Sequence, residues 1–140
     1  MNGMAALNQY RQVVNQGGII DASPHQLILM LMDGAMGRIS TAKGCLQRGE
    51  VARKGELISG AISIIEGLRG SLNHEAGGEI ARNLDNLYEY MTRQLVRANL
   101  DNGAAPLDEV TALLREVKEA WIAIPAEPRT SHARRASELA

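Results

Sequence analysis

The side chains most often used in catalysis and metal binding are few in this sequence, and they lie far apart. Its three histidines are His25, His74 and His132, and none has a second His or Cys at the spacing of a zinc site. No Glu-x-x-His pair, the motif that binds two metal ions in helical bundles, occurs anywhere in the chain. His74 followed by Glu75 and Glu79 is the nearest approach to a metal cluster, and acidic residues equally suit the first turn of a helix. We therefore predict no catalytic residue, no metal site and no cofactor.

The composition narrows the possible partners. The 140 residues are 45% hydrophobic, which suits one globular domain with its own core. The 15 basic residues nearly balance the 16 acidic ones, so the chain offers neither nucleic acid nor an anionic membrane a basic surface. Cys45 is the single cysteine, and the first residues lack the order of a signal peptide. No apolar run approaches the ~18 residues of a membrane span. We expect a cytoplasmic protein without nucleic-acid binding or membrane insertion.

The elements that position these residues are helices. Ser23, Pro24 and Gln26 form a capping sequence, and the apolar period after them predicts a helix over about 23–46. Similar periods predict helices over about 51–73, from Ile80 to about 99, and from Pro106 to Pro125, with a loop over 99–106. Alternating strand patterns are absent. The fold class is all-α, and an antiparallel up-and-down four-helix bundle is the simplest packing.

The two ends of the chain have other patterns. Residues 1–21 contain a short amphipathic set that ends at Gly17-Gly18, which predicts a mobile N-terminal capping helix on a flexible hinge. Its apolar members are Met4, Leu7, Tyr10 and Val14. Residues 125–140 lack an apolar period and are predicted to be a flexible tail, so the helical domain covers residues 1–124.

The second predicted helix is rich in small residues, each helical glycine costing about 1 kcal/mol against alanine. They either allow a neighbouring helix of the bundle to pack closely, or they form the bottom of a trough that a helix of a partner occupies. The small residues are Ser59, Gly60, Ser63, Gly67, Gly70 and Ser71. Four apolar side chains flank this trough, and five on the third predicted helix complete a candidate binding groove: Leu57, Ile58, Ile64, Ile65, Leu84, Leu87, Tyr88, Met91 and Leu95.

An ordered set of motifs over about residues 4–122 resembles the FliS family of flagellar export chaperones. The set consists of Tyr10, Ala22-Ser23-Pro24, Leu27-Ile28, Asp33-Gly34-Ala35, Ile64-Ile65-x-x-Leu68, Asn83-Leu84-x-x-Leu87-Tyr88-x-Tyr90, Ala98-Asn99 and Trp121.

The resemblance implies a cytosolic, non-enzymatic chaperone. Such a protein binds the disordered C-terminal segment of flagellin, prevents its premature polymerisation and delivers it to the export-gate protein FlhA. It also implies that the segment with Met4, Leu7 and Tyr10 covers part of the groove when no client is bound, and that Leu7 and Tyr10 contact the export gate. Three alternatives to compare are this chaperone, an unrelated helical adaptor that forms a homodimer, and a bundle enzyme or metal carrier.

Overall fold

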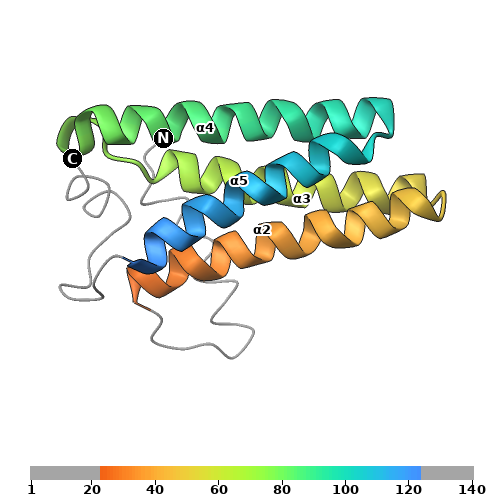
Figure 1. The fold of residues 1–140 in the computed structure, drawn as a ribbon, viewed down its shortest axis with the longest axis horizontal. Helices are drawn as coiled ribbons and strands as arrows, with labels where there is room; N and C mark the ends of the chain where they lie inside the picture. Colours follow the sequence, from red (N-terminus) through yellow and green to blue (C-terminus); the bar gives the residue numbers. More distant parts are fainter. Residues whose placement is uncertain (1–22, 124–140) are drawn as a thin grey trace.

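A computed structural model of the chain describes residues 23–123, which form four helices (Figure 1). They are α2 (Pro24–Gln47), α3 (Val51–Gly70), α4 (His74–Asp101) and α5 (Ala104–Ala123). Each helix packs against two neighbours, in the pairs α2 with α3, α3 with α4, α4 with α5, and α5 with α2. In Figure 1, α5 runs obliquely from the right-hand end of α4 to the left-hand end of α2. The predicted all-α four-helix bundle is confirmed.

The start of α2 has the predicted capping chemistry. Ser23 Oγ accepts a hydrogen bond from the Gln26 amide at 3.1 Å, and Gln26 Oε1 accepts one from the Ser23 amide at 3.0 Å. Pro24 occupies the first helical position, where the missing N–H would have no helical partner. The local sequence therefore fixes where the bundle begins among the described residues.

Two predicted boundaries are wrong. The helix expected over 51–73 ends at Gly70, where the Ser71 hydroxyl donates to the Leu68 carbonyl at 2.7 Å. The loop expected over 99–106 is far shorter, because α4 continues to Asp101 and α5 begins at Ala104. Asn102 ends α4 in the left-handed conformation (φ 53°), which asparagine tolerates. Pro106 falls within the first turn of α5, where proline does not interrupt a helix.

The start of α4 is also different from the prediction. The prediction starts this helix at Ile80, but α4 begins at His74 with one helical turn capped by the Asn73 side chain, which accepts from the Ala76 amide at 3.0 Å. Gly78 then breaks the helical geometry with φ 53° and ψ −127°. Any residue with a Cβ is strained at those angles, so this position requires glycine. The break separates the first turn of α4 from the rest of the helix, which packs in the bundle.

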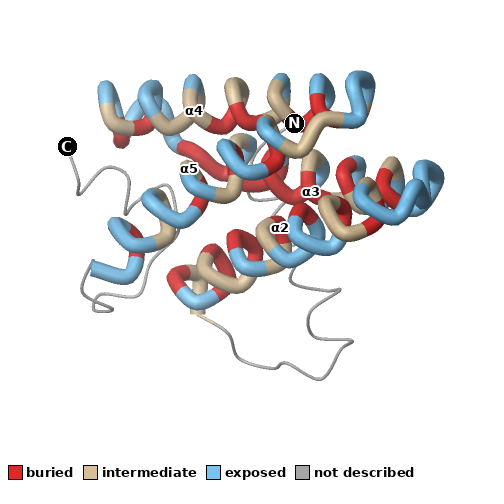
Figure 2. Tube along the Cα trace, turned by 45° about the vertical axis from the view of Figure 1, so that its right-hand side comes forward, coloured by how far each residue is buried: buried red, intermediate tan, exposed pale blue. Residues whose placement is uncertain are grey.

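The core is aliphatic, and it lies where the four inner faces meet (Figure 2). α2 and α3 supply most of it, and Tyr88 and Trp121 are its aromatic members among the described residues. The largest fully buried apolar side chains are Tyr88, Leu27, Ile28, Met32, Ile39, Ile58, Ile65, Leu68, Met91 and Leu95.

Polar contacts hold both ends of the bundle. At one end, His25 Nε2 donates to the Trp121 carbonyl and Trp121 Nε1 donates to the His25 carbonyl, each at 3.0 Å, while the two rings stack 5.0 Å apart. At the other end, Lys54 is only 2% exposed and donates to the Asn99 carbonyl and to Asn102 Oδ1. The lysine thus supplies donors to the carboxyl end of α4, whose last carbonyls lack helical partners.

Candidate functional site

The nine predicted groove residues are divided between α3 and α4, and the structure buries six of them. Ile58, Ile64, Ile65, Tyr88, Met91 and Leu95 belong to the core. Leu57, Leu84 and Leu87 are half-buried against it and reach the surface. Burial raises the pKa of the Tyr88 phenol, which therefore stays neutral. The six buried side chains do not line an open groove in this structure, because the same apolar period that would bind a partner also builds a core. Their contact with a client stays a prediction.

The small residues of α3 divide between two environments. Gly67 and Ser71 are buried, and a Cβ at Gly60 would lie 3.0 Å from Arg38 Cδ and Nε of α2. Ser59 and Ser63 are exposed instead. Gly60 therefore faces the side chain of Arg38 on α2, whereas Ser59 and Ser63 lie on the outer side of α3 together with the exposed Gly70. The two interpretations of this stripe each apply to part of it.

Exposed apolar side chains gather at one corner of the described bundle. Leu100 is 77% exposed, Val51 59% and Val96 44%. The Lys54 contact with Asn99 places the first turn of α3 beside the last turns of α4, so these three side chains share one end of the α3–α4 pair. We call Val51, Val96 and Leu100 the corner surface. Ile122, 54% exposed, is the other large exposed hydrophobic residue in the described range and lies near the opposite end of the bundle.

An open hollow of about 530 Å³ lies on the α5 side of the same end. Its walls are polar at Gln94, Arg97 and Asp101 of α4, and Pro106 lies across from them. Gln94 Nε2 donates to Glu109 Oε1 at 2.8 Å, which closes one side of it. The end of the bundle that carries the α2–α3 and α4–α5 connections therefore has both exposed apolar side chains and a hollow beside them.

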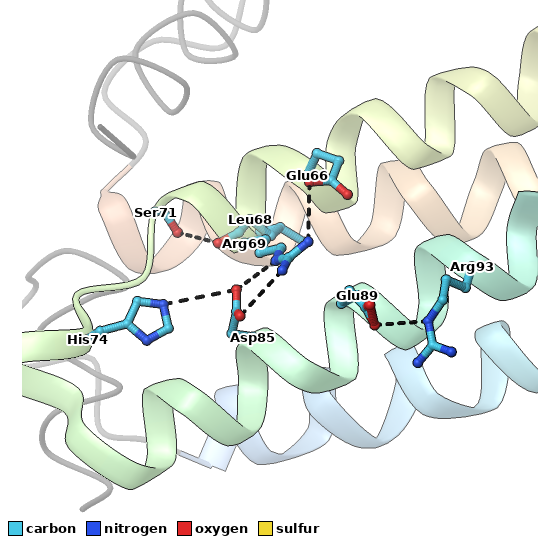
Figure 3. Close-up of polar contacts among 8 residues, drawn as sticks. All are labelled: Glu66, Leu68, Arg69, Ser71, His74, Asp85, Glu89 and Arg93. Atoms are coloured by element: carbon cyan, nitrogen blue, oxygen red, sulfur yellow. Dashed lines mark hydrogen bonds and ion pairs between the residues drawn. The ribbon is translucent and has the colours of Figure 1, made fainter. Parts of the chain in front are cut away.

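A charged cluster links α3 to α4 at the other end (Figure 3). Arg69 Nε donates to Asp85 Oδ1 at 2.7 Å, and Glu66 and His74 lie within 4.0 Å of Arg69 and Asp85 respectively. The hydrogen bond to Asp85 raises the pKa of the Arg69 guanidinium. All of these groups satisfy one another, so the cluster fastens the two helices together and resembles no catalytic arrangement.

The predictions on metal binding, membrane insertion and the two chain ends are compared with the described residues next. His74 contacts Asp85, and no group of three metal-ligating side chains comes together within residues 23–123. Over the same residues, no helix is long and apolar enough to cross a membrane. Met4, Leu7 and Tyr10 of the predicted cap lie outside the described residues, as do the predicted tail and its boundary.

Sequence reasoning missed the corner surface. Val96 and Leu100 lie off the apolar stripe that runs from Ile80 to Ala98, and Leu100 was placed in a loop. An apolar residue outside the stripe of an otherwise amphipathic helix was the available signal, because such a residue cannot reach the core.

Comparison with known proteins agrees with these features. The sequence model of the family "Flagellar protein FliS" matches residues 6–128. The chain is 50% identical over 121 residues to the flagellar secretion chaperone FliSB of Pseudomonas aeruginosa, covering 86% of this chain and 96% of that protein. It is 48% identical over 118 residues to the FliS chaperone of Salmonella typhimurium (84% and 87% covered), and 32% identical over 130 residues to that of Bacillus subtilis (92% and 96% covered). An all-helical bundle that matches these proteins over most of its length belongs to the FliS family of flagellar secretion chaperones, a non-enzymatic family.

Proposed function

We propose that this protein binds the disordered C-terminal segment of flagellin in the cytosol, prevents its premature polymerisation and delivers it to the export-gate protein FlhA. The carrying observation is the match to flagellar secretion chaperones over most of the chain. The bundle supports it physically, because exposed apolar side chains and half-buried leucines offer a temporary surface to segments that would otherwise pair with one another.

Titration calorimetry with the purified C-terminal segment of flagellin tests the binding step. We expect a one-to-one complex with a strongly negative heat-capacity change, because folding of a disordered segment on the bundle buries on the order of 1,000–3,000 Å². Absence of binding at micromolar concentration would contradict the proposal. A heat-capacity change near zero would contradict it equally.

Delivery is tested separately from binding. The predicted contact with the export gate uses Leu7 and Tyr10, on the segment that also carries Met4. We expect the Leu7→Ala, Tyr10→Ala pair to reduce flagellin secretion while flagellin binding persists. Removal of residues 1–16 should leave client affinity unchanged or modestly higher, because a cap lowers the fraction of molecules with an open site. Loss of most client affinity on this truncation would mean that the segment belongs to the binding site.

The alternative function is that of a helical adaptor in which two copies of the chain form a homodimer through the apolar faces of their helices. Sedimentation of the free protein and of the complex distinguishes it from the one-to-one complex.

A further inference from the structure

The two halves of α5 are held to the bundle in different ways. The first half contacts both neighbouring helices, because Asp108 accepts from Lys43 of α2 at 2.7 Å and Glu109 accepts from Gln94 of α4 at 2.8 Å. It also has buried apolar side chains at helical spacing, which are Leu107, Val110 and Leu114. The first half is therefore anchored in the core and fastened on two sides.

The second half of α5, residues 115–123, has one buried side chain, Trp121. Val117 and Lys118 are half-buried, and the other residues of this half are exposed. Because α5 runs obliquely from the end of α4 toward the start of α2, this half lies over α2 (Figure 1). Two contacts join it to that helix: Lys118 Nζ lies 2.6 Å from Asp33 Oδ1, and Trp121 pairs with His25.

The His25–Trp121 pair satisfies a carbonyl that α5 cannot satisfy itself. In a longer helix the amide four residues ahead would donate to the Trp121 carbonyl, but residue 125 is a proline and has no N–H. His25 Nε2 donates to this carbonyl at 3.0 Å instead, and Trp121 Nε1 donates to the His25 carbonyl at the same distance. The end of α5 therefore depends on one residue of α2.

The start of α2 is held more firmly than the end of α5. Leu27, Ile28 and Leu31 follow His25 within two turns, and all three are buried in the core. α2 also packs against α3 as well as against α5. Rupture of the His25–Trp121 pair therefore releases the second half of α5 and leaves the start of α2 in place.

We propose that residues 115–123, which we call the α5 strap, detach from α2 as a unit while the rest of the bundle stays folded. Segments with few buried apolar contacts open at a lower free energy than the whole domain. Detachment uncovers the Trp121 ring and Leu29, which lies one turn after His25 on the same side of α2. This end of the bundle gains apolar surface only when the strap is open, whichever client the protein binds.

Hydrogen exchange of the full chain, followed by mass spectrometry at several urea concentrations, tests the proposal. We expect amides of the α5 strap to exchange through an opening that depends little on urea, because detachment exposes little surface. The buried amides of α3 should exchange more slowly and with the full urea dependence of global unfolding. If the strap exchanges at the rate and with the urea dependence of α3, it opens only with the whole bundle and the proposal is wrong.

Two histidine variants test the contact that closes the strap. His25→Ala should raise exchange across residues 115–123 about tenfold, the factor that corresponds to the loss of one hydrogen bond. His74→Ala is the matched control, because His74 lies at the same end of the bundle but contacts Asp85 of α4, and it should leave exchange of the strap unchanged. A response to His25→Ala confined to the last turn, with residues 115–119 unaffected, would mean that the helix end frays and that no strap opens as a unit.

Discussion

The substitution Gly37→Ala should make this protein more stable. Gly37 lies in the interior of α2 on its exposed side, and a Cβ built there meets no atom within 4 Å. Alanine removes the conformational freedom that glycine has in the unfolded chain and adds no clash. The gain is about 1 kcal/mol, the difference between the two residues in a helix interior. For a chain of this size, that gain raises the thermal midpoint by about 3–6 °C.

Thermal unfolding followed by circular dichroism measures this gain, and two other glycines provide controls. Gly78→Ala should lower the midpoint, because φ 53° and ψ −127° strain any other residue by about 1–3 kcal/mol. Gly60→Ala should gain less than Gly37→Ala, since its Cβ would press on the Arg38 side chain at 3.0 Å. An unchanged or lower midpoint for Gly37→Ala would refute the reasoning, because it would mean that the space beside Gly37 is occupied in the folded protein.

Two further substitutions test contacts in the bundle. His25→Ala removes both the 3.0 Å hydrogen bond to the Trp121 carbonyl and the ring stack, and it should lower the free energy of unfolding by about 1–3 kcal/mol. The fluorescence of Trp121, the single tryptophan, should change in the same variant, and an unchanged spectrum would contradict the stack. Burial raises the pKa of Tyr88, so the folded state keeps its phenolic proton while the unfolded state loses it as the pH rises through the ordinary value of 10.0. Stability should fall above that pH, and less steeply in Tyr88→Phe; equal slopes in urea titrations at several alkaline pH values would contradict the burial.

Local signals in the sequence predicted most of the fold. The capping residues Ser23 and Gln26 set the start of α2 through bonds between neighbours, and the apolar period of each helix is visible without knowledge of its packing partner. The predicted helix boundaries are wrong where a contact with a distant residue or an unusual backbone angle determines the end of a helix. Lys54 stabilises the end of α4 from another helix, and Gly78 lets one extra helical turn precede the rest of α4. Neither effect can be recognised from the spacing of apolar residues in the sequence.

The candidate site was harder to predict for a physical reason. A stripe of apolar residues has the same spacing whether it faces the core or a partner, so Tyr88 and Met91 carried no sign of which role they have. Burial depends on the neighbouring helices, and these assign both side chains to the core. Leu100 shows the converse, since its position off the stripe of α4 left it exposed.

Burial also bears on how a client can bind. Use of the six buried groove residues as a binding surface would require α3 and α4 to separate, exposing Ile58, Ile64, Ile65, Tyr88, Met91 and Leu95. At about 1.5–3 kcal/mol for each large apolar side chain, the cost is on the order of 10 kcal/mol, as large as the whole stability of a typical domain. Docking onto side chains that already reach the surface carries no such cost. We therefore expect a client to contact Leu57, Leu84, Leu87 and the corner surface before any buried residue, with the core serving to hold those side chains in place.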